Sequence, residues 1–326
     1  MKLNKSLLLP LLAACALLAA VASQAAAPMV KTQAPGYYRT MLGDFEITAL
    51  SDGSHPFPID TVMTHIAAKA IAQDLDRADL TAPVQGSINA FLINTGKKLI
   101  LVDAGAGVLY GACCDKLMTN LRAAGYRPEQ VDEVLLTHLH KDHAGGIMSQ
   151  GKAAFPNAVL RLSQTEADYW LTPANQASAP DFLSTFFDAA RAAVAPYQAA
   201  KRYEPYRQFG QLEAGIDALP APGHTPGHAM YRVQSGGQQL LIWGDIVHVT
   251  AIQLQHPEAT VKYDSSEADA AATRARLLQS LSNEHTLVGA AHIAFPGLGR
   301  IRKTTETAGT YDWLPLNYDG TPGTVN

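Results

Sequence analysis

The chain has 326 residues, of which 47% are hydrophobic and 17% are charged, and its formal net charge at pH 7 is −4. This is the composition of a folded globular protein, with length for one large α/β domain or two smaller ones. Because binding to a polyanion needs clustered Lys and Arg, the mild acidity and the lack of a basic run argue against a nucleic-acid partner.

The N-terminal residues 1–25 predict a signal peptide. Two lysines precede an apolar, Ala-rich run from Leu7 to Val21, and small residues at 25–27 fit a cleavage site. The run is short for a membrane span. We therefore expect an exported protein, periplasmic or secreted, with no integral membrane span after processing. The alternative is a lipoprotein anchored through Cys15, but apolar residues follow Cys15 where a lipoprotein carries a polar tether.

Cys113 and Cys114 remain once the signal is removed. Export would place them in an oxidising compartment, yet a bridge between adjacent residues would be strained. We therefore expect two packed thiols and no disulfide framework.

After a linker at residues 26–36, strand and helix patterns alternate through a single predicted domain at 37–326. Strand patterns cover 45–50, 90–94, 99–102, 133–137, 158–162, 229–233, 239–242 and 286–290. Helix patterns cover 115–124, 164–171, 181–195 and 265–281. A turn is predicted at 51–53, and a long loop or helix pair at 54–85. Hairpins and helices in both halves predict an α/β fold with two packed sheets and helices outside, a four-layer αββα sandwich.

A cluster of metal-ligand residues follows the predicted strand 133–137. Its sequence is His138-Leu139-His140-Lys141-Asp142-His143. In an extended segment residues i and i+2 point the same way, so His138 and His140 are placed to bind one ion together. Asp142 and His143 follow at a helix start and are placed to face a second ion. Imidazole and carboxylate ligands without cysteine suit a catalytic Zn²⁺ or a neighbouring metal.

Three later segments supply further ligands. His224 lies in the tight turn Pro222-Gly223-His224-Thr225-Pro226-Gly227-His228, and Asp245 and His292 each end an apolar strand. A carboxylate has two oxygens, so Asp245 can bridge two ions.

In this order and spacing the residues resemble those of the metallo-β-lactamase superfamily, over nearly the whole chain after the signal. The resemblance implies two divalent metals, with one on His138, His140 and His224, the other on Asp142, His143 and His292, and Asp245 bridging them. Zinc is the expected metal, with Mn, Fe or Co as alternatives. The resemblance also implies that Asp103 orients a ligand, and we expect His228 to be a structural residue behind the ligands.

A closer resemblance is to the methyl parathion hydrolase subgroup, which includes phosphotriesterases and hydrolases of lactones or aryl esters. It is carried by segments 34–39, 42–53, 124–133, 155–159 and 295–297. It implies a homodimer and an aromatic substrate pocket that contains Tyr110, Trp170, and Phe186 or Phe187.

The sequence departs from the organophosphate version of that pocket. His248 stands where an aliphatic residue is expected, Tyr263 where a smaller apolar residue is expected, and Val62 where an Arg is expected. His248 would narrow the cleft and could donate a proton to a carbonyl or leaving group. The departures favour a planar ester or lactone over a bulky phosphotriester.

We therefore expect a small-molecule hydrolase in which a metal-bridging hydroxide attacks a lactone or aryl carboxylic ester. Asp245, Asp142 and His248 are the expected catalytic residues, and Tyr263 joins the pocket. The alternative is organophosphate triester hydrolysis; β-lactam hydrolysis and a non-catalytic zinc-binding role are further alternatives.

Overall fold

The computed structural model describes residues 27–284, 286–305 and 307–318. Two compact units divide the chain, Met1–Ala34 and Pro35–Asn326, and each is described by itself. The predicted signal peptide and Cys15 lie outside the described residues. Within the first unit, residues 27–34 carry neither helix nor strand.

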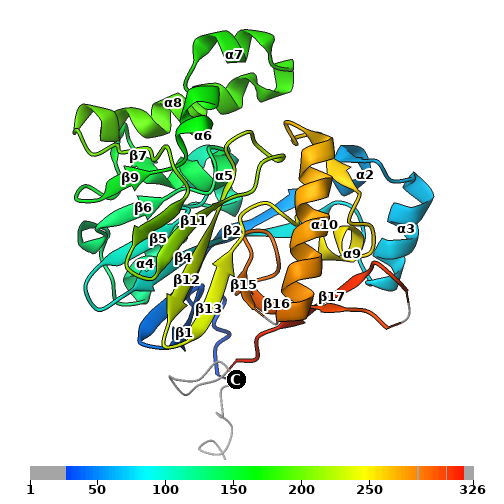
Figure 1. Ribbon diagram of the computed structural model, residues 1–326. Coiled ribbons are helices and arrows are strands. Elements are labelled where there is room, and N and C mark those ends of the chain that lie inside the picture. Colours follow the sequence, from blue (N-terminus) through cyan, green and yellow to red (C-terminus); the bar gives the residue numbers. More distant parts are fainter. Residues whose placement is uncertain (1–26, 285, 306, 319–326) are drawn as a thin grey trace, which may run out of the picture. The chain divides into compact units, whose positions relative to one another are not determined.

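Two sheets form the centre of the second unit (Figure 1). The first sheet contains, in spatial order, β1 (Tyr37–Leu42), β2 (Phe45–Phe57), β4 (Val84–Asn94), β5 (Leu99–Val102), β6 (Glu133–Leu135) and β9 (Val159–Arg161). The second contains β10 (Gly210–Glu213), β11 (Ile216–Pro220), β12 (Ala229–Ser235), β13 (Gln238–Ile242), β15 (Leu287–Gly289), β16 (Leu298–Lys303) and β17 (Tyr311–Pro315). Two short ribbons pair β3 (Met63–Thr64) with β14 (Thr260–Val261) and β7 (Met148–Ser149) with β8 (Lys152–Ala153).

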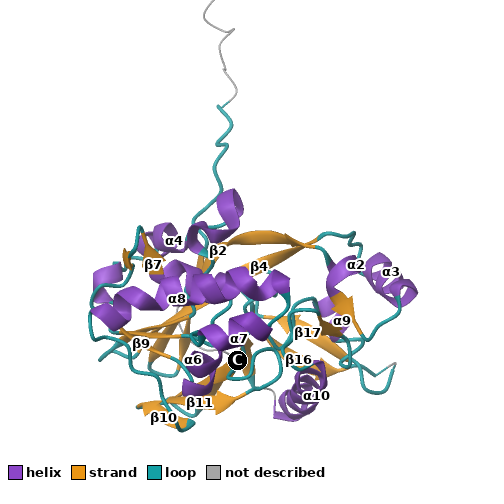
Figure 2. Ribbon diagram, turned by 90° about the horizontal axis from the view of Figure 1, so that it is seen from above, coloured by secondary structure: helices purple, strands orange, loops and turns teal. Residues whose placement is uncertain are grey.

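Helices cover the outer faces of both sheets. The α-helices are α2 (Ile59–Val62), α3 (Ala68–Arg77), α4 (Leu117–Ala123), α5 (Lys141–Ala144), α6 (Gln164–Trp170), α7 (Pro173–Ser178), α8 (Ser184–Ala199), α9 (Thr250–Gln253) and α10 (Glu267–Glu284). The 3₁₀ turns are η2 (Gly107–Cys113), η3 (Pro128–Gln130), η4 (Gly145–Ile147) and η5 (Asp181–Leu183). Seen from above, α4 and α10 lie at opposite edges of the unit (Figure 2). Among the described residues, no helix combines the length and the apolar character that a bilayer crossing requires.

The alternation of apolar residues in the strands explains the layers. In β4, Phe91 and Ile93 belong to the core between the two sheets, whereas Ala90 and Leu92 belong to the core beneath α4 and α8. Successive side chains of a strand point to opposite faces, so a strand that is apolar on both faces must be covered on both. On the far side, Leu241 of β13 packs in the core that α10 covers. The predicted four-layer αββα sandwich is therefore confirmed.

A smaller apolar cluster lies at one end of the unit, where α2, α3 and α9 gather (Figures 1 and 2). Its residues come from the stretch 57–84 and from 249–263. The sequence predicted only a loop or helix pair for 54–85, because α2 and α3 are short and their apolar residues are few.

The predicted turn at Ser51-Asp52-Gly53 was wrong. β2 continues through it to Phe57, with a shift of register between Ser51 and Gly53. The Asp52 carboxylate does not close a turn of its own. It accepts hydrogen bonds from the backbone N–H groups of Ala106, at 2.9 Å, and Leu117, at 3.1 Å, and so joins two distant loops.

The loops that follow the parallel strands lie together at one edge of each sheet. β5, β6 and β9 run parallel to one another, and so do β13 and β15. The carboxyl ends of parallel strands meet at the same edge, where α/β proteins place their ligands. Asp103, the 138–143 loop, Asp245 and His292 all lie just beyond such ends.

The inter-sheet core gives a stability prediction. We expect Phe91→Ala to lower the free energy of unfolding by about 3–5 kcal/mol, because Phe91 is 1% exposed between the two sheets and its removal leaves a cavity. Urea unfolding of the metal-free protein measures the loss. The control is Leu314→Ala on β17, where the residue is 38% exposed; this substitution should change the free energy of unfolding by less than about 1 kcal/mol. Equal losses of stability in the two variants would contradict the assignment of Phe91 to the core between the sheets.

Candidate metal centre

The predicted metal ligands converge at the edge of the two sheets. His138 and His140 come from the loop after β6, and His140 forms the N-cap of α5. Their imidazoles lie in one group with those of later segments, as the i, i+2 spacing predicted. Asp142 and His143 lie in the first turn of α5, which turns them toward a second group.

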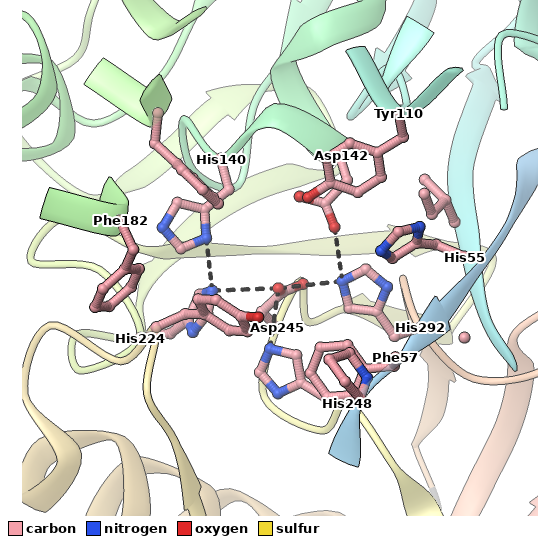
Figure 3. A pocket seen from close by; sticks show the side chains of 15 residues that line it. His55, Phe57, Tyr110, His140, Asp142, Phe182, His224, Asp245, His248 and His292 are labelled. Carbon is pink, nitrogen blue, oxygen red and sulfur yellow. Dashed lines mark hydrogen bonds and ion pairs between the residues drawn. The ribbon is translucent and has the colours of Figure 1, made fainter. Parts of the chain in front are cut away.

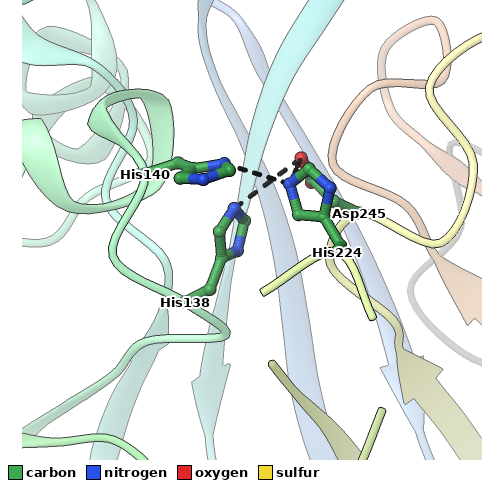
Figure 4. A group of neighbouring side chains, drawn as sticks. All are labelled: His138, His140, His224 and Asp245. Atoms are coloured by element: carbon green, nitrogen blue, oxygen red, sulfur yellow. Dashed lines mark hydrogen bonds and ion pairs between the residues drawn. The ribbon is translucent and has the colours of Figure 1, made fainter. Parts of the chain in front are cut away.

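The first group contains His138, His140, His224 and Asp245 (Figure 4). Nδ1 of His140 lies 3.0 Å from Nε2 of His224, which lies 3.2 Å from Oδ2 of Asp245. Nε2 of His138 lies 3.7 Å from the same oxygen. Three imidazole nitrogens and a carboxylate oxygen are thus turned toward a common point.

The second group contains Asp142, His143 and His292, with Asp245 between the two groups. Nε2 of His143 lies 3.0 Å from Oδ1 of Asp245 and 3.4 Å from Nε2 of His292. Nε2 of His292 lies 3.4 Å from Oδ2 of Asp142 and 3.2 Å from Oδ2 of Asp245. The Asp245 carboxylate therefore faces donors of both groups.

The residues fit a pair of divalent cations. Nε2 of His138 is fully buried without a hydrogen-bond partner among the described residues. Buried polar atoms are normally satisfied, so such an atom beside a cluster of nitrogens indicates a missing ligand. Three imidazoles around one point and two imidazoles with a carboxylate around the next are donor sets that bind Zn²⁺ and similar metals.

The surrounding histidines favour the ionised form of Asp245. Burial opposes ionisation, but His143, His292 and His138 together hold the pKa of Asp245 well below its ordinary value. Burial lowers the pKa of His138 and of His140 well below the ordinary value, so both imidazoles are neutral. A neutral imidazole and an ionised carboxylate are the forms that ligate metals.

Three ligand histidines are oriented by hydrogen bonds on their outer nitrogens. Nδ1 of His143 lies 2.8 Å from the Asp103 carboxylate, and Nδ1 of His224 lies 2.7 Å from the Asp264 carboxylate. Nδ1 of His292 lies 2.9 Å from the Ser87 carbonyl oxygen, to which it donates. Each contact turns Nε2 inward and fixes the tautomer that presents a lone pair there.

Asp103 lies where the sequence expected a ligand-orienting carboxylate. Besides facing His143, it accepts hydrogen bonds from the backbone N–H and the hydroxyl of Thr137, both at 2.8 Å. Asp264 and Ser87 were missed, because a carboxylate inside an irregular segment and a backbone carbonyl leave no pattern in the sequence.

His228 lies behind the ligands rather than among them. Its Nδ1–H donates to the Ala221 carbonyl oxygen at 3.0 Å, and its Nε2 accepts from the backbone N–H of Asp245 at 3.1 Å. Burial lowers the pKa of His228 to about 3, so the neutral tautomer persists. Gly244 precedes Asp245 with φ +60°, and a Cβ there would lie 2.4 Å from Nε2 of His228. His228 thus fixes the backbone that presents Asp245.

Glu166, another residue that the sequence did not single out, joins the two halves of the first group. Its buried carboxylate accepts from the backbone N–H of Leu139 at 2.9 Å, from the hydroxyl of Thr225 at 2.6 Å and from the backbone N–H of Gly227 at 3.0 Å. It therefore ties the 138–143 loop to the turn that carries His224.

A cavity of about 220 Å³ opens onto both ligand groups (Figure 3). Four residues predicted for the pocket line it: Tyr110, Phe186, His248 and Tyr263. The other lining residues outside the ligand groups are His55, Phe57, Pro58, Gly86, Ile88 and Phe182. His55 packs against the Tyr110 ring with centroids 4.7 Å apart.

Trp170 and Phe187 do not line the cavity, which corrects the sequence prediction. Both side chains are fully buried in the core beneath α6 and α8, with ring centroids 4.5 Å apart. Trp170 instead packs edge-on behind the His140 ring, at 5.1 Å between centroids. Adjacent helical positions point about 100° apart, so Phe186 reaches the cavity while Phe187 faces the core. Val62 is buried in α2 and is not among the lining residues.

His248 lies beside both ligand groups. Its Nε2 lies 3.2 Å from Oδ2 of Asp245, and its ring stacks between those of Phe57 and His292, at 5.9 and 5.5 Å between centroids. Burial lowers the pKa of His248, so the ring is a neutral imidazole.

Asp264 provides a test of the ligand geometry. We expect Asp264→Asn to weaken binding of zinc by about 10–100-fold, because the amide loses the charge that polarises His224. Competition with a chromophoric chelator measures the affinity. Asp76→Asn, at an exposed position on α3, is the matched control and should leave it unchanged; wild-type affinity in Asp264→Asn would remove the residue from the site.

The family is settled by comparison with known proteins. The family model described as the metallo-β-lactamase superfamily matches residues 83–292. A solved structure titled as the hydrolase AbOPH in the β-lactamase superfamily is 36% identical, with 88% of this chain and 100% of that chain covered and a TM-score of 0.83. The structure of AidC, titled a dizinc quorum-quenching lactonase in complex with a product, is 25% identical, with 87% and 99% covered and a TM-score of 0.80.

Curated relatives match over a shorter length. The "probable metallo-hydrolase" of Mycobacterium tuberculosis is 28% identical over 197 residues, which are 49% of this chain and 59% of that protein. An N-acyl homoserine lactonase of Bacillus cereus is 26% identical over 128 residues, or 39% and 43% of the two chains. The chain thus spans about half the length of the curated relatives it matches. The matched model and the 36% identical structure nevertheless cover most of this chain, and the chain belongs to the metallo-β-lactamase superfamily.

Proposed function

We propose that this chain is a metal-dependent hydrolase that cleaves lactones or aryl carboxylic esters with two divalent cations, zinc in the first instance. The observation that carries the proposal is the cavity, whose floor is formed by residues of both ligand groups and whose walls are mainly aromatic and aliphatic. A pocket of this kind binds a small apolar molecule and places one polar bond of it over the floor.

The charge of the walls favours a neutral substrate. Among the described residues that line the cavity, none is Lys or Arg. A phosphomonoester or an acidic carrier thioester would therefore find no Lys or Arg among these residues to pair with its negative charge. Phe57, Phe186 and Tyr263 instead line the cavity with apolar ring surface that an aryl or acyl group can contact. Their rings lie near one another, with centroids 6.2 Å apart for Phe57–Tyr263 and 6.4 Å apart for Phe186–Tyr263.

Bound cations would polarise the scissile carbonyl and lower the pKa of water toward neutrality. Asp245 would hold both of them, with Asp142 beside the second. Burial, and then the Asp142 carboxylate, raise the pKa of Tyr110 well above its ordinary value, so its hydroxyl keeps its proton and can donate to a substrate oxygen. His248, neutral and next to Asp245, would limit the width of the cavity and favour a planar ester.

The relatives support this substrate class. AidC is titled a lactonase, and the matched Bacillus proteins are named N-acyl homoserine lactonases. The methyl parathion hydrolase-like subgroup is part of the proposal, on the motifs quoted above. So are export and a homodimer, which fractionation of the producing cell and light scattering of the purified protein would test.

A substrate panel tests the reaction. With zinc loaded, we expect turnover of dihydrocoumarin and phenyl acetate with a kcat/KM at least about tenfold above that for paraoxon, since paraoxon is bulkier and tetrahedral at phosphorus. Removal of the metal should abolish all turnover while circular dichroism shows the fold retained. A higher kcat/KM for paraoxon would favour the organophosphate alternative, and no turnover in either state would favour a metal-binding role.

His248 tests the choice between ester and phosphotriester. We expect His248→Leu to raise the ratio of paraoxon to dihydrocoumarin turnover by about tenfold, because an aliphatic side chain removes a polar group and reshapes the wall. His65→Asn is the control: His65 is an exposed imidazole outside the cavity, and Asn tolerates its left-handed backbone, φ 55°. A ratio that does not move would refute the specificity role of His248.

A further inference from the structure

The two adjacent cysteines lie directly behind one wall of the cavity. Cys114 is buried, Cys113 is half-buried, and their Sγ atoms are 2.6 Å apart. They pack in one small apolar cluster with Ile88 and Tyr110, both of which line the cavity. The Sγ–H of Cys113 is placed to donate to the carbonyl oxygen of Tyr110, at 3.2 Å.

The backbone around the pair is held in place. Within η2, Gly111 adopts φ +71°, a left-handed conformation that interrupts the helical turn just before the pair. The carbonyl oxygen of Cys113 would lie 2.0 Å from a Cβ on Gly53, so β2 approaches the pair closely. Asp52 accepts the backbone N–H groups of Ala106 and Leu117, one on each side of the pair. The thiols are therefore brought together by the fold.

We propose that Cys113 and Cys114 form a reversible disulfide with each other, a redox modification site that stiffens the segment bearing Tyr110. The sequence alone suggested that strain would keep this pair reduced. In the structure the thiols are already within bonding reach. Strain raises the reduction potential of a disulfide, and strained disulfides are the labile and regulatory ones.

The chemistry is exchange with a small-molecule disulfide. The more accessible Cys113 thiolate attacks one sulfur of the reagent, which forms a mixed disulfide and releases the first thiolate. The Cys114 thiol then gives its proton to solvent and attacks Sγ of Cys113, which releases the second. Two cysteine thiols are oxidised and one reagent disulfide is reduced to two thiols. Burial raises the pKa of the Cys114 thiol, so the first attack falls to Cys113.

Alkylation after redox equilibration tests the proposal. The zinc-loaded protein carries Cys15→Ser, so that these are its only thiols. It is incubated with oxidised glutathione or with a phosphine reductant, alkylated and digested. We expect complete loss of alkylation at both cysteines after oxidation, with the peptide lighter by two hydrogen atoms, and full recovery after reduction. Alkylation of both thiols in the oxidised sample, or glutathione retained on Cys113, would overturn the proposal.

Amide hydrogen exchange tests the stiffening without any assay of turnover. We expect slower exchange across residues 107–116 in the oxidised protein than in the reduced protein. Cys113→Ser, at the half-buried position, should lose this dependence on the oxidant while its metal content stays that of wild type. The same slowing in Cys113→Ser, or no slowing in wild type, would show that the pair does not control the segment.

Discussion

The structure depends on one buried carboxylate. Asp245 lies at the edge of the second sheet, 4% exposed, and imidazoles from four separate segments approach within 3.0–3.7 Å of its two oxygens. A buried charge is costly unless it is paired, and a cluster of imidazoles is costly unless something shares their lone pairs. The buried carboxylate and the imidazoles around it therefore stabilise one another. Two bound cations would pair with the negative charge of Asp245 and with the lone pairs of the imidazoles.

The sheets bring these groups together by the direction of their strands. The 138–143 loop follows the carboxyl end of β6 in the first sheet, and Asp245 follows that of β13 in the second. Hydrogen bonds between the sheets hold the two edges in register: the backbone N–H of Ala229 donates to Thr137 at 2.9 Å, and the Tyr231 hydroxyl donates to Leu136 at 2.7 Å. Asn89 of β4 binds the carbonyl oxygens of Ala290 and Ile293, on both sides of His292. The core between the sheets thus fixes the geometry of the ligands.

The sequence predicted the layers and the ligand set because both leave local patterns. The alternation in β4 marks a strand covered on both faces, and the spacing of His138 and His140 marks two side chains on one side of an extended segment. Glu166, Asp264 and Asn89 leave no such pattern, because the contacts through which they position the ligand segments join them to residues at least 27 positions away in the sequence. The prediction that Trp170 and Phe187 line the pocket failed for a related reason. Composition shows that aromatic residues are present, but only the helix phase decides which of them reach the cavity.

The cavity walls have a different origin from its floor. Phe57 and Tyr263 belong to the small cluster around α2, α3 and α9, and Tyr110 belongs to η2, whereas the ligands belong to loops fixed by the two large sheets. Substitution of Phe57 or Tyr263 can therefore change the shape of the cavity without replacing a ligand. In the proposed hydrolase, the floor would set the kind of bond that is broken, and the walls would set which molecule is held over it.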